Sequence, residues 1–174
     1  GARLTNGGVA AGVSAAELSA TVESVWLDLS KGLGCPVGAV LSGSREFIHE
    51  AWRWKHRIGG AMRQAGIVAA AGSWALKHHV DRLAEDHENA QLLAKRISAL
   101  DGVTLVNEKV ETNMVFFDVS KTPLSAAEIS ARLREKGIWI GPFGEQKMRA
   151  VTHLDVRRED IIETSDALAD ILVH

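Results

Sequence analysis

The stretch Ser24–Gly38, SVWLDLSKGLGCPVG, decides the fold of the first part of the chain. Its apolar run at 25–29 has the β-forming residues and the length of a buried strand. The run stops at Ser30 and Lys31, where three glycines and a proline rule out a helix and let the backbone pass close to another group. A single lysine, Lys31, therefore stands at the mouth of a predicted buried strand, in a glycine-rich turn.

A lysine in this position has two interpretations. Partial burial disfavours the charged ammonium, so more of the lysine is the neutral amine that attacks carbonyl carbons, which is the chemistry of a Schiff-base lysine. The simpler interpretation is a solvated charge at a strand end. On spacing alone the simpler interpretation of Lys31 is the more common one.

The composition is that of an ordinary globular protein. Hydrophobic residues make up 46% and charged residues 24% of the 174 residues, which allows a substantial core. The formal net charge of −2 carries no basic excess, which argues against nucleic acid or an anionic membrane as a partner. No apolar run reaches the length of a membrane span. The single cysteine, Cys35, suits a reducing compartment, and we expect a cytoplasmic protein.

Periodicity and turn residues predict the elements of the first part of the chain. We expect a weak helix over 2–12, a short helix over 15–22 that opens with a capping box at Ser14–Glu17, strands at 25–29 and 39–41, and a helix over 45–57. From Ile67 to Leu100 the three- and four-residue spacing of apolar side chains predicts one long helix that bridges two domains, with room for a slight break at Val80–Asp81.

The second part reads as a compact α+β domain. The predicted elements are strands at 103–106 and 114–119, a helix over 125–136 that opens with a second capping box at Ser125–Glu128, strands at 138–140 and 148–152, and a helix over 157–173. This order predicts helices on one side of a mainly antiparallel sheet. The chain is thus divided into residues 1–80, a linking helix over 81–100, and residues 101–174.

Other patterns carry less chemistry. The glycine loop lacks the Gly-Lys-Ser/Thr of a phosphate loop, and no helix opens directly behind it, so neither common nucleotide fingerprint fits. The seven histidines are expected to be packed or hydrogen-bonded side chains, and no metal site is predicted. Arg63, in a glycine-rich loop, and Arg149, inside an apolar strand, could each form a structural salt bridge or bind the carboxylate or phosphate of a ligand.

Several segments occur in the order found in threonine aldolases, and the chain resembles that family from residue 1 to residue 174. The segments are GARLTN, LSKGLGCPVG, RWKHRIGGAMRQAGIVAAAG, RLAEDHENA, ETNMVFFDV and RAVTHLDVRRED. These enzymes use pyridoxal phosphate and have the aspartate-aminotransferase-like fold. The resemblance implies an α/β chain: the C-terminal part of the large cofactor-binding domain, at the end of a mainly parallel sheet, followed by a small α+β domain. It also implies that the N-terminal half of the enzyme is absent from this sequence, which begins without a methionine.

The resemblance assigns roles to five residues. Lys31 matches the lysine that bonds the cofactor, and Arg3 matches an arginine near the cofactor's phenolic oxygen. Arg63 matches an arginine near the cofactor phosphate, in a loop that is often lent to an adjoining subunit, and Ser30 is expected beside the same phosphate. Arg149 matches the arginine that grips the substrate's α-carboxylate. No metal ligand is implied.

The implied activity is retro-aldol cleavage of threonine, allo-threonine and related β-hydroxy-α-amino acids to glycine and an aldehyde, with pyridoxal 5'-phosphate as cofactor. The implied assembly is a homo-oligomer, a tetramer or dimer of dimers, and the chain needs the N-terminal half for activity. Two alternatives remain open from the residues: another pyridoxal-phosphate lyase or aminotransferase of the same fold, and a non-catalytic fragment that serves as an assembly module.

Overall fold

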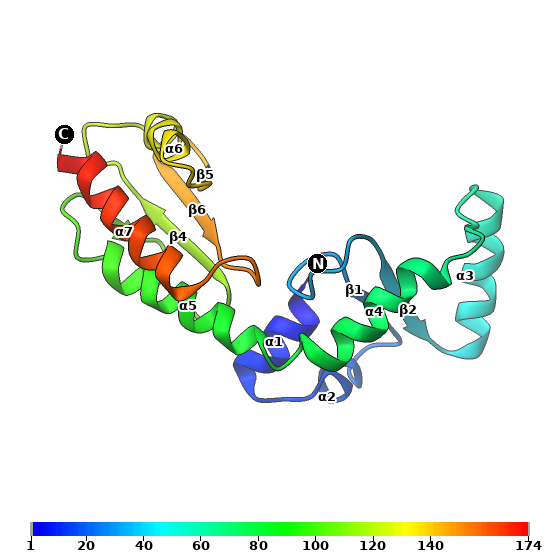
Figure 1. Ribbon diagram of the computed structural model, residues 1–174. Coiled ribbons are helices and arrows are strands. Elements are labelled where there is room, and N and C mark those ends of the chain that lie inside the picture. The colour runs from blue at the N-terminus through cyan, green and yellow to red at the C-terminus, as the bar shows by residue number, and fades with distance from the viewer. Residues whose placement is uncertain (1, 174) are drawn as a thin grey trace. The chain divides into compact units, whose positions relative to one another are not determined.

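The computed structural model describes residues 2–173 and divides the chain into two compact units, Gly1–Leu83 and Ala84–His174 (Figure 1). The boundary falls between Leu83 and Ala84, just inside the segment 81–100 that we predicted as a linking helix. The three-part division of the chain stays a prediction, and each unit is described by itself.

The first unit contains four helices and two strands among its described residues. They are α1 (Arg3–Ala11), α2 (Ala15–Ser19), β1 (Ser24–Asp28), β2 (Ala39–Gly43), α3 (Arg45–Arg57) and α4 (Gly66–His78). Five of these elements were expected, with shifts of a few residues at their ends, and α4 was expected as the first part of one longer helix. The Ser14–Glu17 capping box is present: the Ser14 hydroxyl accepts the Glu17 N–H, and Glu17 accepts the Ser14 N–H.

Strands β1 and β2 pair antiparallel, from Ser24 opposite Gly43 to Asp28 opposite Ala39. We expected the end of a mainly parallel sheet here, and no parallel pair occurs within residues 2–173. The expectation that β1 is buried is wrong for this chain by itself, since Trp26 is 55% exposed and Asp28 is the one buried residue of the strand. Two strands cannot cover their own faces, and such a ribbon is marginal on its own.

The core of the first unit lies beneath the turn that follows β1. Its buried members are Leu29, Leu33, Cys35, Ala75 and Leu83. Helix α4 approaches this turn closely, because a Cβ atom on Gly72 would lie only 2.8 Å from Leu29 Cδ1. The apolar contacts therefore fix the end of β1 rather than its middle.

The predicted continuous helix over 67–100 is broken. Helix α4 ends at His78 and α5 (Leu83–Ile97) begins at Leu83. Between them, His79 Nδ1 lies 2.7 Å from the Leu33 carbonyl oxygen, and the Leu83 N–H bonds the Val80 carbonyl at 3.1 Å. The break falls near Val80–Asp81, where the sequence allowed one. It depends on the contact between His79 and Leu33, which is distant from His79 in the sequence.

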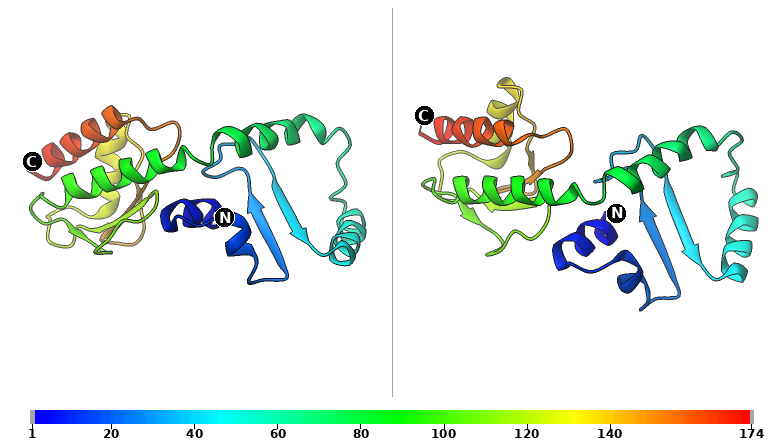
Figure 2. Two further views of the ribbon diagram at one scale, coloured as in Figure 1. Left: turned by 90° about the horizontal axis from the view of Figure 1, so that it is seen from below. Right: turned by 60° about the horizontal axis from the view of Figure 1, so that its bottom comes forward.

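The second unit is a four-stranded antiparallel sheet with helices on one face, as expected. After α5 come β3 (Thr104–Leu105), β4 (Met114–Asp118), α6 (Ala126–Glu135), β5 (Gly141–Pro142), β6 (Lys147–Val151) and α7 (Arg158–Val173). The strand order is β3-β4-β6-β5. Helices α5 and α7 lie side by side (Figure 2), and Arg96 of α5 bonds Ser165 and Asp166 of α7.

Alternation along the central strands separates the two faces of this sheet. Val115 and Phe117 of β4 and Met148 and Ala150 of β6 point into the core with α5, α6 and α7. The residues between them point to the other face and are exposed or half-buried. Arg149 is one of them, so it lies on the open face of the sheet and not in a half-buried setting.

The strand predicted at 138–140 is wrong, and β5 forms at Gly141–Pro142 instead. The end of α6 holds the preceding residues: Gly137 has φ +79°, and the Ile138 N–H bonds the Leu133 carbonyl at 3.0 Å. Ser130 Oγ donates to the Ile140 carbonyl at 2.7 Å. Backbone groups that serve a helix end are not available to a sheet. The capping box Ser125–Glu128 at the other end of α6 is confirmed.

Two methionines on neighbouring strands test the division into faces. Met148 is fully buried and Met114 is 43% exposed. We predict that Met148→Ala lowers the free energy of unfolding by about 2–5 kcal/mol, because it leaves a cavity in the core. Met114→Ala should cost less than about 1 kcal/mol. Denaturant titration followed by circular dichroism measures both, and equal losses would contradict the assigned faces.

Candidate active site

The segment 30–38, nine residues with both ends included, is here called the Lys31 loop and lies between β1 and β2. Three backbone hydrogen bonds fold it: Gly34 N–H to Lys31 O at 2.8 Å, Cys35 N–H to Leu29 O at 3.0 Å, and Leu29 N–H to Gly38 O at 3.0 Å. Gly34 and Gly38 have φ of +71° and +129°, which favour glycine. The loop is a folded structure with Lys31 near its start.

The loop is anchored by its apolar side chains and leaves its lysine outside. Leu33 and Cys35 are buried, whereas Lys31 is exposed. The expected partial burial of Lys31 is therefore not supplied by the described residues. Burial raises the pKa of the Cys35 thiol, which suits a packing side chain and not a nucleophile.

A carboxylate that the sequence analysis did not single out controls the start of the loop. Asp28, the last residue of β1, is only 5% exposed. Its Oδ1 accepts the Ser30 N–H at 3.0 Å and the Ser30 hydroxyl at 3.1 Å. This is an Asx turn closed by a second bond, and it determines where the chain goes immediately before Lys31.

Helix α1 packs against the Lys31 loop. A Cβ atom on Gly32 would lie 3.0 Å from Leu83 Cδ2 and 3.1 Å from Asn6 Nδ2, so Gly32 is a close approach between α1, the loop and the start of α5. Arg3 lies one turn before Asn6 and thus on the same side of α1. The Arg3 side chain is exposed, on the helix that adjoins the loop.

Arg63 follows α3 in an exposed loop. No hydrogen bond or ion pair joins it to the Lys31 loop in the part of the chain that the structure describes. Helix α3 itself has no buried residue. Lys55 Nζ lies 4.8 Å from the Trp52 ring, Arg57 Cζ lies 5.2 Å from the Trp54 ring, and the His56 ring is tilted against Trp52 with centroids 5.3 Å apart. Arg63 and Lys31 are thus not brought together by contacts within this chain.

Arg149 has an aromatic setting on the open face of the second unit. It lies opposite Phe116 on one neighbouring strand and opposite Gly141 on the other. Its Cζ lies 5.6 Å from the centroid of the Phe143 ring, and Phe143 meets Phe116 edge-on with centroids 5.2 Å apart. No salt bridge to Arg149 occurs within residues 2–173, so the structural salt bridge left open by the sequence is not seen there.

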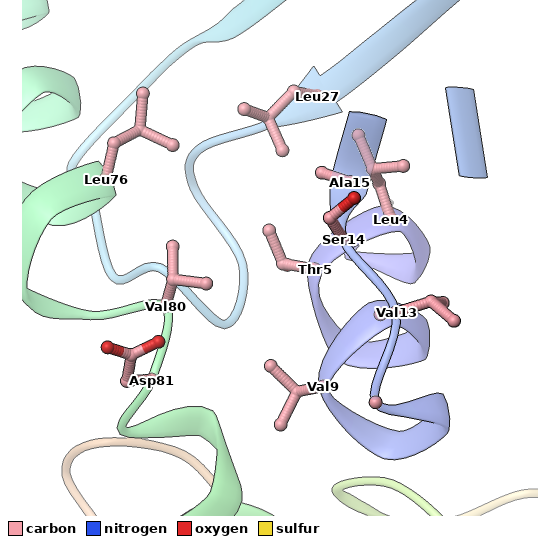
Figure 3. Close-up of a pocket in the computed structure, with 12 residues that line it drawn as sticks. Leu4, Thr5, Val9, Val13, Ser14, Ala15, Leu27, Leu76, Val80 and Asp81 are labelled. Atoms are coloured by element: carbon pink, nitrogen blue, oxygen red, sulfur yellow. The ribbon is translucent and has the colours of Figure 1, made fainter. Parts of the chain in front are cut away.

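An apolar cleft of about 600 Å³ lies in the first unit (Figure 3). Leu27 of β1 and Leu76 and Val80 near the end of α4 face Thr5 and Val9 of α1 across it (Figure 3). None of the predicted site residues lines this cleft. Its lining is that of an unfilled hydrophobic contact and not of a catalytic centre.

Metal sites, membrane spans and buried histidines are further possible features of the described residues. Within the described residues, no three His, Cys, Asp or Glu side chains are grouped to hold a metal ion, and no helix is long and apolar enough to cross a membrane. His87 is buried in α5, and desolvation lowers its pKa, as for a packed histidine.

Sequence comparison assigns the chain to a family. The family described as "Beta-eliminating lyase" matches residues 1–121, and the chain belongs to this family. It is 41% identical over 165 residues to the low-specificity L-threonine aldolase of Escherichia coli (strain K12), covering 95% of this chain and 47% of that protein. It is 38% identical over 162 residues to low-specificity L-threonine aldolase 1 of Arabidopsis thaliana, covering 92% of this chain and 45% of that protein. The chain spans about half the length of these curated relatives.

Solved structures agree on the fold. The chain superposes with a TM-score of 0.79 on a crystal structure from Exiguobacterium sp. 255-15 named as a candidate aromatic amino acid beta-eliminating lyase/threonine aldolase, at 25% identity over 98% of this chain and 51% of that one. The cystine C-S lyase C-DES matches with a TM-score of 0.69 and 18% identity, covering 93% of this chain and 49% of that one. The expected resemblance to threonine aldolases and the expected fold are confirmed, and the family implies pyridoxal 5'-phosphate.

The residues present suit that cofactor. Lys31 offers an exposed amine that can bond an aldehyde carbon, and Gly32 leaves no side chain beside it. Arg3 is exposed on the adjoining helix, and its guanidinium makes no hydrogen bond or ion pair with any described residue. Pyridoxal phosphate carries both an aldehyde and anionic oxygens. An amine can bond the aldehyde, and a guanidinium can donate hydrogen bonds to the anionic oxygens.

Gly32 tests how closely α1 and the loop approach. We predict that Gly32→Ala lowers the free energy of unfolding by about 1–3 kcal/mol, because the added methyl group crowds the buried Leu83 and Asn6 side chains. Gly7→Ala is the control: apart from its chain neighbours and the nearby backbone of α1, no atom lies within 4 Å of its Cβ position, and the substitution should stabilise the helix by up to about 1 kcal/mol. Thermal denaturation of the two variants measures both effects. An unchanged stability of the Gly32→Ala protein would contradict the close approach of α1 to the loop.

Proposed function

We propose that this chain is the C-terminal half of a pyridoxal-phosphate-dependent aldehyde-lyase. The enzyme cleaves threonine, allo-threonine and related β-hydroxy-α-amino acids to glycine and an aldehyde. The observation that carries the proposal is Lys31, an exposed lysine at the start of a rigid glycine loop, in a chain 41% identical to proteins named low-specificity L-threonine aldolases.

Pyridoxal phosphate, when bound, supplies an electron sink for the charge left on the substrate's Cα after a bond to it breaks. The residues of this chain hold the cofactor and orient the substrate. Lys31 provides the amine that anchors the cofactor and, once released, a base or acid for proton transfer. Arg3 serves the cofactor's phenolic oxygen and Arg63 its phosphate. Both of Ser30's hydrogen-bond donors are bound to Asp28.

Arg149 grips the substrate carboxylate. A guanidinium carries five N–H donors in one plane, and two of them match the two oxygens of a carboxylate. The donors of Arg149 are not used by any described residue, and the Phe143 ring limits where the guanidinium can lie. Such a fixed fork orients the substrate for cleavage of the Cα–Cβ bond.

The proposed enzyme needs an N-terminal half. The relatives are about twice as long as this chain. The β1–β2 ribbon exposes Trp26, Val40 and Leu41, and the cleft between α1 and α4 is apolar, which are the surfaces expected where further strands and helices pack.

The enzyme is also proposed to be a cytoplasmic homo-oligomer, a tetramer or dimer of dimers, in which the Arg63 loop serves an adjoining subunit. The support is that no residue of α3 or of the loop after it is buried. Trp52, Trp54 and Met62 are each more than half exposed. Large exposed apolar side chains grouped in this way are typical of protein interfaces.

A second candidate is β-elimination, which the family description favours. The same lysine and carboxylate-binding arginine would serve it, so the product discriminates: aldol cleavage gives glycine and an aldehyde, whereas β-elimination gives a 2-oxo acid and ammonia. Glycine and acetaldehyde from threonine, with no 2-oxo acid from serine or cystine, would decide for the aldolase.

Lys31 is tested against a second lysine in the same sequence context. Asp28-Leu29-Ser30-Lys31 and Asp118-Val119-Ser120-Lys121 share the pattern Asp-apolar-Ser-Lys. We predict that Lys31→Ala abolishes the absorption band of the lysine-bound cofactor in the assembled enzyme, while Lys121→Ala leaves it unchanged. A band that survives in Lys31→Ala would remove Lys31 from the role.

Arg149 is tested by substrate affinity. Loss of a bidentate, charge-assisted pair costs about 1.5–3 kcal/mol per hydrogen bond, so Arg149→Ala should raise KM for threonine by at least about 100-fold with the cofactor still bound. Arg134→Ala is the matched control, because Arg134 also lies over an exposed aromatic ring, that of Trp139 at 4.6 Å, and has no proposed role. An unchanged KM for Arg149→Ala would contradict the assignment.

A further inference from the structure

We propose that Asp28 is a positioning residue for Lys31, and that Ser30 acts with it as part of one hydrogen-bonded turn and not as a ligand of the cofactor phosphate. The inference rests on the proposed function, since it assumes that Lys31 bonds the cofactor. It gives a role to a buried carboxylate that the proposed chemistry leaves unused.

The hydrogen bonds of Ser30 limit what it can do. A carboxylate accepts and cannot donate, so the proton in the 3.1 Å contact between Ser30 Oγ and Asp28 Oδ1 belongs to the serine. The Ser30 N–H donates to the same oxygen at 3.0 Å. Serine has no further donor, and a phosphate group accepts hydrogen bonds from donors. In this arrangement Ser30 presents only lone pairs to a phosphate.

Asp28 is held where it can act on the loop. It is 5% exposed at the end of β1, opposite Ala39 of β2, and the next residue, Leu29, is buried against Gly72 of α4. These contacts position the Asp28 carboxylate. Its two hydrogen bonds in turn position Ser30, the residue directly before Lys31. Three residues on from Lys31, the Gly34 N–H bonds the Lys31 carbonyl at 2.8 Å, so the lysine's backbone is held on both sides.

The second Asp-apolar-Ser-Lys segment shows what this pattern does without a cofactor lysine. Asp118 ends β4, Val119 is fully buried, and the Ser120 N–H donates to Asp118 Oδ1 at 2.8 Å. Hydrogen bonds from Ser120 lower the pKa of Asp118. The pattern thus encodes a strand-ending turn in which serine binds aspartate. Asp28 differs from Asp118 by being buried, whereas Asp118 is half-buried.

The phosphate group provides the discriminating experiment. The assembled enzyme and its variants are titrated with pyridoxal 5'-phosphate and with pyridoxal, which lacks the phosphate, and binding is read from the absorption of the lysine-bound aldehyde. We expect Ser30→Ala and Asp28→Ala each to weaken both ligands by the same factor, about tenfold. The double variant should be no weaker than either single one, because both residues act through one turn.

Matched controls come from the second turn. Ser120→Ala and Asp118→Ala should leave both affinities unchanged. In the cofactor-free protein, Asp28→Ala should also speed hydrogen exchange of the Ser30 amide, while Asp118→Ala should speed that of Ser120 alone. This readout requires neither cofactor nor activity, and the Ser30→Ala titration stands even if Asp28→Ala does not fold, since Ser30 is exposed.

The outcomes separate the inference from the proposed function. A Ser30→Ala protein that loses affinity for pyridoxal 5'-phosphate but not for pyridoxal would make Ser30 a phosphate ligand and overturn the inference. Multiplied losses in the double variant, about 100-fold in place of tenfold, would overturn it as well. If the wild-type enzyme bound neither aldehyde at Lys31, the proposed function itself would fail.

Discussion

The first unit depends on the contact between the end of β1 and helix α4. Leu29 packs against Gly72, Leu33 is buried, and His79 binds the Leu33 carbonyl at 2.7 Å. These contacts hold a loop whose glycines would otherwise leave it mobile, and they also bend the chain between α4 and α5. The same constraint thus determines where Lys31 stands and where a long helix has to break.

The second unit gives Arg149 its setting by a different means. Strict alternation in β4 and β6 puts Val115, Phe117, Met148 and Ala150 into the core and turns Arg149 to the open face. The charge therefore needs no buried partner, and its donors stay available beside the Phe143 ring. A helix-covered core on one side thus leaves Arg149, the proposed carboxylate-binding residue, exposed on the other side of the sheet.

Local signals in the sequence predicted much of this structure. The capping boxes at Ser14 and Ser125, helix α3 and the antiparallel α+β unit follow from spacing and turn residues alone. The errors share a cause, which is contact between distant residues. The bend at His79 depends on Leu33, and residues 138–140 are held by Leu133 and Ser130. Asp28 was overlooked although Asp-x-Ser is a known turn pattern, because its importance lies in burial, which spacing does not reveal.

The central claim is that Lys31, held by the loop, is the residue that bonds the cofactor. The most direct measurement is to load the assembled enzyme with pyridoxal 5'-phosphate, reduce it with borohydride, digest it and locate the modified lysine by mass spectrometry. The account predicts one modified peptide, carrying the cofactor on Lys31. Modification of another lysine in its place, or of none, would contradict it.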